Sequence, residues 1–391
     1  MWYLLAFICC FLIDADKQKN PLIRGALIFL VITILCFGYM TGTDWRNYEP
    51  YFYNPNLGEH FTDREPGFTI FNRIAGQVIS DFWIFSAICK IFYTYSLIHL
   101  IKRFSPYPWS VFALTLVISS LFLIVNCPLR FMLALGIYYF AFSYFLSKKY
   151  VIASVLSFIS LTFHVTLIIL ILISCLGIFS DKIFKLKRKV LVILSIFCMF
   201  LSSQIWLYNF IFNALLGYIG LDMFQDSGYA IFSSGAVFTI GALWQFCMIC
   251  LIIYFKAKFA DIQYGKLIFT YSVAFFCLSV ICLPIYTAFR ITLFCSTFFC
   301  ISIVFIVHQQ LNLFIQTRYI RKIIYMFFGL LVIKTVYGSF VYYPYSNSLP
   351  YIISGHLPYN VRSQYNITEY SKFSGESVDM KRKIGDNTEN L

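Results

Sequence analysis

One long apolar stretch, residues 148–189, decides the fold class. It reads KKYVIASVLSFISLTFHVTLIILILISCLGIFSDKIFKLKRK, and residues 150–179 within it include no Asp, Glu, Lys or Arg. A single membrane crossing needs about 20 apolar residues, so this run is too long for one simple span. A single crossing would also leave one of its two basic flanks on the wrong side of the membrane. We therefore predict two short crossings that turn near residues 162–164.

The composition of the whole chain supports a membrane protein. Of 391 residues, 60% are hydrophobic and only 12% are charged, whereas soluble domains carry about 25% charged residues. Lipid must therefore face much of the chain, and long apolar runs span lipid as closed helices. We predict an all-α integral membrane protein, a polytopic bundle of about 12 transmembrane helices with a site on its outer face. The crossings are expected near residues 2–13, 22–41, 82–101, 108–126, 130–147, twice within 150–179, and near 190–213, 236–255, 267–283, 287–308 and 323–340.

The ends of the chain and its cysteines complete this organisation. The first apolar run lacks a basic start and a small-residue cleavage site, so we interpret it as a retained first helix and not as a signal peptide. We expect a transmembrane domain over residues 1–343 and a polar, partly irregular tail over 344–391. Most of the 13 cysteines lie in apolar runs, where free cysteine behaves as a small hydrophobic residue, so no disulfide framework is expected.

The distribution of charge predicts the orientation in the membrane. The net charge of +13 could suggest a nucleic acid partner, but the basic residues form short clusters between apolar runs and no basic stripe or zinc-finger spacing, so no such partner is expected. The loops 14–24, 102–107, 147–150, 180–189, 256–266 and 309–322 carry 18 of the 30 Lys and Arg residues. Since positive loops stay inside, we predict that these loops are cytoplasmic and that the segment 42–66 and the loop 214–235, both rich in acids, lie outside.

Arginines on the predicted outer side break this pattern. They are Arg46, Arg64, Arg73, Arg130 and Arg290. Arg130 and Arg290 each open a predicted crossing, where the helix dipole disfavours a cation. Guanidinium groups bind phosphate oxygens through paired hydrogen bonds, so these arginines would suit a lipid-linked diphosphate. Alternatively, each could pair with a nearby carboxylate or extend to the lipid headgroups.

The outer segment also begins with residues typical of sugar recognition. Residues 42–49 read GTDWRNYE, in which carboxylates and amides would bind hydroxyls and aromatic rings would stack on sugars. Asp44 or Glu65 could act as the general base that deprotonates a sugar hydroxyl. An aromatic belt at the membrane surface would also explain Trp45 and Tyr48, though less easily Asp44.

Three further polar residues lie within apolar runs. His164 stands at the predicted turn. It is either a packing residue, or a general base or a hydrogen-bond donor to phosphate. Lys90 and Lys334 lie within crossings, and lysines there are functional candidates unless they pair internally. The five histidines are scattered and show no metal-ligand spacing, and there is no P-loop or GxSxG motif, so neither a metal nor another cofactor is expected.

Taken in order, these motifs resemble the EpsG/Wzy-type polysaccharide polymerases of bacterial capsule, exopolysaccharide and O-antigen clusters. The resemblance runs over residues 38–351 and begins with residues 42–48 and Phe52, followed by Glu65-Pro66-Gly67-Phe68. It continues with Arg130, Leu133-Ala134, Phe163-His164, Arg290 and Leu349-Pro350-Tyr351. Two positions depart from the family pattern: Phe131 replaces a glutamine, and Val165 replaces a small residue or proline.

The resemblance implies a reaction and a location. Such proteins join repeat units carried on undecaprenyl diphosphate at the outer face of the bacterial cytoplasmic (inner) membrane. Arg130 and Arg290 would bind the diphosphate, with Arg46, Tyr48 and Arg64 as further substrate-binding residues. Asp44, Glu65 or His164 would be the base or would orient the acceptor. The expected partners are the undecaprenyl-diphosphate-linked glycan and membrane lipid, and the resemblance allows a chain-length regulator protein.

Two other functions compete with polymerisation. A flippase for the same lipid-linked units is less favoured because no repeat halves and no Gly/Pro-broken helix pairs are evident. Another glycosyltransferase or ligase with a polyprenyl-linked donor would use the same arginines and acids, so the sequence does not separate it from a polymerase. A membrane acyltransferase is least favoured because His164 has no second polar catalytic residue near it in sequence.

Overall fold

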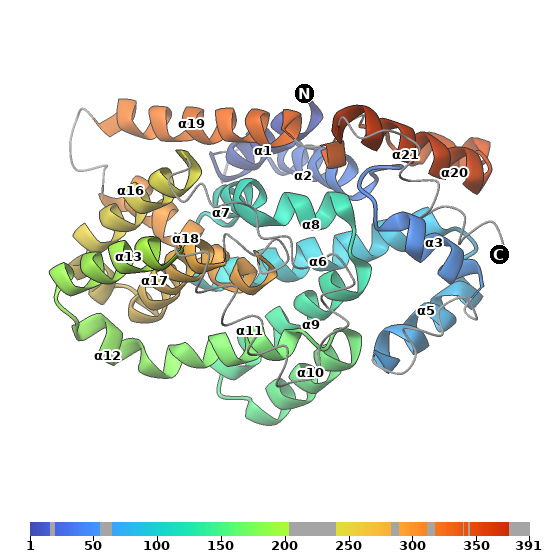
Figure 1. The fold of residues 1–391 in the computed structure, drawn as a ribbon. Helices are drawn as coiled ribbons and strands as arrows, with labels where there is room; N and C mark the ends of the chain where they lie inside the picture. Colours follow the sequence, from blue (N-terminus) through green and yellow to red (C-terminus); the bar gives the residue numbers. More distant parts are fainter. Residues whose placement is uncertain are drawn as a thin grey trace. The chain divides into compact units, whose positions relative to one another are not determined.

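The computed structural model describes residues 1–15, 20–54, 65–202, 240–282, 289–310, 317–338, 340–342 and 345–374. Within these ranges the regular structure is helical, and the extended backbone pairs in one isolated antiparallel bridge between Gly38 and Asn347. The chain forms two compact units. The first unit holds residues 1–100, 108–167 and 322–391, and the second holds 101–107 and 168–321. Figure 1 labels their helices.

The first unit is built from both ends of the chain. Its helices from the N-terminal part are α1 (Trp2–Ala15), α2 (Pro21–Cys36), α3 (Trp45–Tyr53), α5 (Pro66–Val78), α6 (Phe82–Phe104, as far as Leu100), α7 (Pro108–Thr115), α8 (Leu121–Asn126), α9 (Leu129–Leu146) and α10 (Tyr150–Phe163). A π-helical turn, Leu116–Ser120, joins α7 to α8 without a break. The C-terminal part adds α19 (Thr317–Tyr337, from Lys322), a 3₁₀ turn at Phe340–Tyr342, α20 (Leu349–Ser354) and α21 (Tyr359–Ser374).

Helix ends in the first unit follow the local sequence. Asn20 caps α2, because its side chain accepts a hydrogen bond from the Leu22 amide at 3.0 Å and Pro21 occupies the first helical position. Cys127 takes a left-handed backbone conformation, which ends α8. Pro128 follows, and α9 starts at Leu129. This tight turn puts Arg130 at the second position of a helix, as the sequence predicted.

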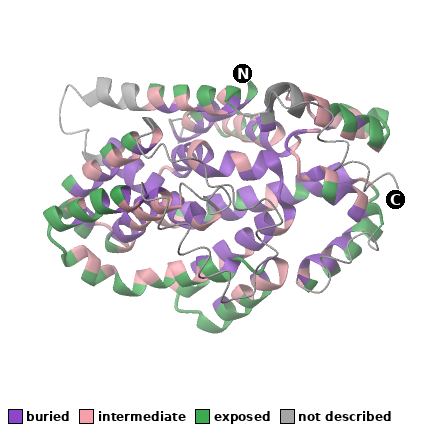
Figure 2. Cartoon of the chain, viewed as in Figure 1, coloured by how far each residue is buried: buried purple, intermediate pink, exposed green. Residues whose placement is uncertain are grey.

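Packing within the first unit is closest between α9 and α10, and α10 also packs against α5. Gly67 in α5 explains how closely these elements approach, because a Cβ atom there would lie 2.2 Å from Oγ1 of Thr162. Figure 2 shows most of α9 buried, while one side of α10 is exposed. The exposed side chains of α10 are largely apolar, among them Val151, Val155 and Phe158, as expected for a surface that faces lipid.

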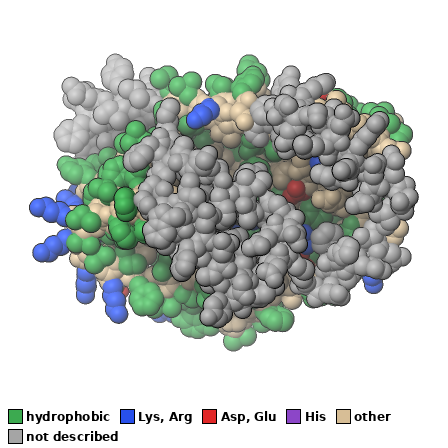
Figure 3. All heavy atoms as spheres, in the orientation of Figure 1, with side chains coloured by type: hydrophobic (Ala, Val, Ile, Leu, Met, Phe, Trp, Pro, Cys, Tyr) green, Lys and Arg blue, Asp and Glu red, His purple; other side chains and the backbone are tan. Residues whose placement is uncertain are grey.

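The second unit is arranged around α17 (Gly265–Ile281). Its other helices are α11 (Leu167–Ser174, from residue 168), α12 (Ser180–Lys185), α13 (Arg188–Ser202), α16 (Ile240–Tyr254) and α18 (Phe289–Phe305), with shorter turns at Cys175–Phe179, Lys256–Asp261 and Ile306–Gln310. Ser272 of α17 and Ser302 of α18 share a buried hydrogen bond of 2.7 Å. At the edge where α12 and α13 meet, lysines and arginines protrude from the surface (Figure 3), and Lys182, Lys185 and Arg188 are exposed there.

The helices bear out the membrane character of the chain. Five helical stretches are long and apolar enough to cross a membrane: Phe82–Phe104, Pro108–Asn126, Leu129–Leu146, Leu167–Lys185 and Arg290–His308. Six shorter apolar helices accompany them: Trp2–Asp14, Pro21–Cys36, Tyr150–Phe163, Gly241–Tyr254, Gly265–Ile281 and Tyr325–Tyr337. The expected total of about 12 crossings also involves residues 203–239, which include the loop 214–235 that was predicted to lie outside, and these residues are not among those described.

Two local expectations can be compared directly with the helices. A turn between two short crossings was predicted near residues 162–164, and the helix does end there: α10 ends at Phe163, His164 is extended, and α11 begins at Leu167. The hairpin itself stays a prediction. The tail was expected to be partly irregular. Within it, residues 349–354 and 359–374 form α20 and α21, which both belong to the first unit.

Candidate functional site

Glu65 lies between two of the residues that the sequence singled out. One carboxylate oxygen accepts a hydrogen bond from Nη1 of Arg130, and the other contacts Nδ1 of His164. The Glu65 and His164 side chains are only 5% and 10% exposed, whereas Arg130 is 22% exposed. The cluster is therefore closed around the carboxylate and open at the guanidinium.

Tyr48 extends this cluster to a third region of the chain. Its hydroxyl oxygen accepts a hydrogen bond of 3.1 Å from Nε of Arg130, and its ring centre lies 5.9 Å from the guanidinium carbon. Arg130 thus has a carboxylate on one arm and a phenol on another. We call Tyr48, Glu65, Arg130 and His164 the arginine cluster.

Each member of the arginine cluster comes from a different helix end or short helix. Tyr48 is in α3, Glu65 directly precedes α5, Arg130 is the second residue of α9, and His164 directly follows α10. The contact of Glu65 with His164 follows from the close approach of α5 to the end of α10 at Gly67.

The protonation states of the cluster follow from its contacts. Burial alone would raise the pKa of Glu65, but its hydrogen bond to His164 and the charge of Arg130 bring that pKa below the ordinary value. Burial raises the pKa of Tyr48, although Arg130 opposes this. At neutral pH Glu65 is therefore a carboxylate and Tyr48 a neutral phenol.

The second ring nitrogen of His164 is distinctive. Nε2 is buried and has no hydrogen-bond partner in the part of the chain that the structure describes. The ring of Phe131 meets the imidazole edge-to-face, with 5.4 Å between ring centres. A carboxylate at Nδ1 favours the tautomer that carries its proton there, which leaves the lone pair on Nε2. Such an imidazole can accept a proton at Nε2.

Asp44 lies in a loop that is fixed to the end of α8. The amide and hydroxyl of Thr43 donate to Oδ1 of Asn126 at 2.9 and 3.1 Å, and the Thr43 hydroxyl also donates to Oδ1 of Asp44 at 3.3 Å. Gly42 has φ +73°, and a Cβ atom there would lie 2.5 Å from Cα of Asn126, so only glycine fits. Asp44 is close enough to Tyr48 to act on it electrostatically.

The remaining arginines are placed differently. Arg46 is half-buried in α3, and its backbone carbonyl accepts a hydrogen bond of 2.8 Å from the Tyr359 hydroxyl. Arg73 is exposed on α5. Arg64 lies outside the described residues. Arg290 is the second residue of α18, the helix start that the sequence predicted, and belongs to the second unit, so the arginine cluster is described without it.

The two lysines of the apolar runs differ from each other. Lys334 is exposed. Lys90 is only 2% exposed, and no described carboxylate lies within ion-pair distance of it. Its charge acts on the thiols of Cys36 and Cys127, which stand at the C-terminal ends of α2 and α8. Helix C-termini attract cations, so these two ends are a favourable environment for a buried lysine side chain.

Sequence reasoning proposed the members of the arginine cluster, but not the contacts that join them. The acyltransferase argument considered only residues near His164 in sequence, and Glu65 provides a polar partner from 99 residues away. Asn126 and the C-terminal residues Arg362 and Asn366, which hold residues 40–49, were also missed. The signal for the two C-terminal residues was the polar character of the tail. Among the described residues, no three His, Cys, Asp or Glu side chains are grouped as metal ligands would be.

Comparison with known proteins gives one family. No curated protein and no solved structure matches the chain. The sequence model of the EpsG family matches residues 22–352, which include the arginine cluster, Asp44 and Arg290. This match covers most of the chain, and the family is associated with Wzy-type polysaccharide polymerases. The chain therefore belongs to the EpsG family.

Proposed function

We propose that this protein polymerises undecaprenyl-diphosphate-linked oligosaccharide repeat units at the outer face of the bacterial cytoplasmic membrane. The observation that carries the proposal is the arginine cluster, in which one buried carboxylate holds both a partly exposed arginine and an imidazole. A cation and a base held side by side are what glycosyl transfer from a lipid diphosphate requires. Membership of the EpsG family supplies the polysaccharide context.

In this proposal Arg130 binds the diphosphate of the donor. Its guanidinium keeps some exposure, so phosphate oxygens can reach it, and Tyr48 and Glu65 fix its orientation. The sequence predicts Arg290, Arg46 and Arg64 as further diphosphate-binding residues, and these assignments stay predictions. Guanidinium groups suit this role because they bind phosphate oxygens in pairs and remain charged.

His164 is the proposed general base. The acceptor hydroxyl would lose its proton to Nε2 while its oxygen forms a bond to the anomeric carbon of the donor. The bond from that carbon to the diphosphate oxygen breaks, and undecaprenyl diphosphate leaves with the electron pair. Arginine would stabilise the charge on the leaving group. Because Nε2 is buried in the present conformation, entry of the acceptor must displace the neighbouring side chains.

The two acids then have different roles. Both oxygens of Glu65 are engaged, so we assign it the orientation of His164 and Arg130. Asp44, in the loop beside Tyr48, remains the alternative base or an acceptor-orienting residue. Neither role needs a metal ion. A chain-length regulator protein is proposed as a partner on the family resemblance alone.

Surface polysaccharide analysis tests the proposal. We expect that deletion of the gene removes the polymer ladder on a gel but leaves glycan with a single repeat unit, and that Arg130→Ala does the same. Arg73→Ala is the matched control, since this arginine is exposed and outside the cluster. Complete loss of surface glycan would favour transport of the repeat unit, and an unchanged ladder would overturn the proposal.

A further inference from the structure

The C-terminal segment, residues 345–366, lies largely beyond the family match, which ends at residue 352. We propose that this segment is part of the site and that Arg362 is a positioning residue, which holds α3 so that Tyr48 meets Arg130. The inference deepens the proposed function and rests on it.

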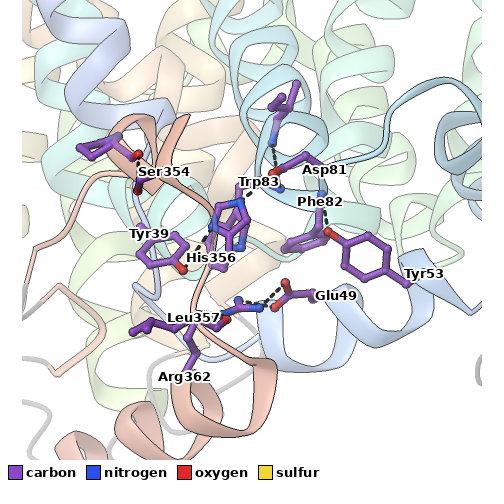
Figure 4. A network of polar contacts seen from close by, with 12 residues as sticks. Tyr39, Glu49, Tyr53, Asp81, Phe82, Trp83, Ser354, His356, Leu357 and Arg362 are labelled. Carbon is purple, nitrogen blue, oxygen red and sulfur yellow. Dashed lines mark hydrogen bonds and ion pairs between the residues drawn. The ribbon is translucent and has the colours of Figure 1, made fainter. Parts of the chain in front are cut away.

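Arg362 is anchored on every arm of its guanidinium (Figure 4). Nη1 and Nη2 donate to the two oxygens of Glu49 at 2.7 and 2.8 Å, and Nε donates to the carbonyl of Leu357 at 2.7 Å. The side chains of Arg362 and Glu49 are 5% and 3% exposed. A paired carboxylate and guanidinium of this kind fix orientation as well as position.

Aromatic rings surround this ion pair. The guanidinium carbon of Arg362 lies 5.9, 5.7 and 5.8 Å from the ring centres of Tyr39, Trp45 and Trp83. Burial alone would lower the pKa of Arg362, but its hydrogen bonds to Glu49 raise that pKa, so the guanidinium stays charged. A buried, fully satisfied pair of charges stabilises little against an apolar substitute, but it defines one arrangement of the elements that carry it.

Further hydrogen bonds bind the same segment along residues 37–49. The amides of Tyr39 and Ser348 donate to the carbonyls of Ser346 and Phe37 at 2.9 and 2.7 Å. The side-chain amide of Asn366 donates to the carbonyls of Met40 and Gly42 at 3.0 and 3.1 Å. These bonds hold the loop that leads into Asp44. The C-terminal segment therefore supports residues 42–49, the predicted sugar-recognition motif.

A third set of contacts surrounds His356 (Figure 4). Its Nε2 lies 2.6 Å from a carboxylate oxygen of Asp81, and its Nδ1 lies 3.3 Å from the hydroxyl of Tyr39. Asp81 directly precedes α6, and its other oxygen accepts from the amides of Trp83 and Ile84 at 2.7 and 3.1 Å. The C-terminal segment is thereby attached to the start of α6 as well as to α3.

The position of Glu49 connects these contacts with the arginine cluster. Glu49 directly follows Tyr48 in α3, a helix of nine residues that contains Pro50. A helix this short has little stability of its own, so its orientation depends on tertiary contacts. Arg130 binds α3 through Tyr48, and Arg362 binds it through Glu49. Fixing Glu49 therefore fixes the direction of the Tyr48 hydroxyl.

A double-mutant cycle tests this coupling. The full-length protein in lipid nanodiscs is given undecaprenyl-diphosphate-linked repeat units, and polymer formation is measured at saturating and limiting donor. We expect Arg362→Lys, which keeps the charge but loses the paired geometry, to lower kcat about tenfold, and Tyr48→Phe to do the same. If Arg362 acts through Tyr48, the double variant is no slower than the slower single variant. Multiplying effects would overturn the inference.

Hydrogen exchange reads the same coupling without the reaction. In Arg362→Lys, the amides of residues 45–53 should lose protection from exchange, while those of residues 129–146 keep it. If the amides of residues 45–53 are as protected in Arg362→Lys as in the wild type, the inference is overturned. Arg73→Lys is the control for both experiments and should change neither. If Arg362→Lys fails to fold, Glu49→Asp, which shortens the carboxylate and keeps the charge, replaces it in the same cycle. A wild-type protein that makes no polymer would overturn the proposed function alone, and the exchange experiment would still decide the positioning of α3.

Discussion

Glu65 and His164 are 99 residues apart in sequence, yet a carboxylate oxygen of the first contacts Nδ1 of the second. The other oxygen of Glu65 holds Arg130, so the carboxylate links a proposed base to a proposed diphosphate-binding cation. This relationship changes what a single substitution at Glu65 should do, because it disturbs two functions together.

Replacement of Glu65 by Gln should slow polymerisation by about 10–100-fold, the usual effect of removing a group that orients a catalytic residue. An amide cannot accept from both Arg130 and His164, since half of it is a donor. The measurement is the rate of polymer formation by purified protein in nanodiscs. A variant with wild-type rate would show that the link is not needed.

His164→Ala should lower kcat by about 10²–10⁴-fold, the range for loss of a general base. Binding of undecaprenyl diphosphate should change little, because Arg130 keeps its contacts with Tyr48 and Glu65. Titration of the lipid and the single-turnover rate separate the two effects. Asp44→Asn belongs in the same experiment: if it abolishes the rate and His164→Ala does not, Asp44 is the base.

Arg130→Lys should impair the protein almost as much as Arg130→Ala. A lysine cannot donate to Glu65, Tyr48 and a phosphate oxygen with the geometry of a guanidinium. We expect loss of the polymer ladder in cells and weaker binding of undecaprenyl diphosphate in nanodiscs. A lysine variant with a normal ladder would reduce the role of Arg130 to charge alone.

Acid should weaken the arginine cluster through Glu65. The pKa of Glu65 is lower in the folded protein than its ordinary value of 4.5. Its contribution to stability is therefore complete at neutral pH and is lost as the pH falls from about 4.5 through the folded pKa. Thermal unfolding in detergent between pH 7 and pH 3.5 should show a steeper loss of Tm for the wild type than for Glu65→Gln. Equal slopes would contradict this account.

Gly42→Ala should destabilise the loop that carries Asp44. The backbone at Gly42 has a positive φ, and the added methyl group would meet Cα of Asn126 at 2.5 Å, where no side-chain rotation can relieve the contact. We expect a cost of about 1–3 kcal/mol in unfolding free energy. Gly25→Ala, with open space around its Cβ position, is the matched control and should cost nothing measurable.

The residues of the site were easier to predict from the sequence than the contacts between them. Arg130 stood out because a cation at a helix start is unfavourable, and His164 stood out because it interrupts an apolar run. Their link through Glu65 depends on how α5, α9 and α10 pack, and no local pattern encodes contacts across 65 and 99 residues. Membrane crossings were predictable from apolar runs, since lipid leaves the backbone few alternatives to a helix.

For the C-terminal segment, in contrast, little in the sequence indicated the buried contacts. Its residues are polar and form no apolar run, so the sequence suggested a tail that begins at residue 344. Arg362 is nevertheless buried, because Glu49 and three aromatic rings replace the water it would otherwise need. Such compensation becomes visible only when both ends of the chain are seen together.

The 313 residues that separate Glu49 from Arg362 also bear on how the protein is made. The ribosome must synthesise and the membrane must accept the whole second unit before α21 exists to bind α3. Until then the buried carboxylate of Glu49 has no guanidinium, and the first unit is incomplete. A chain that ends at residue 352, where the family match stops, would lack Arg362, and α3 would then be without this anchor.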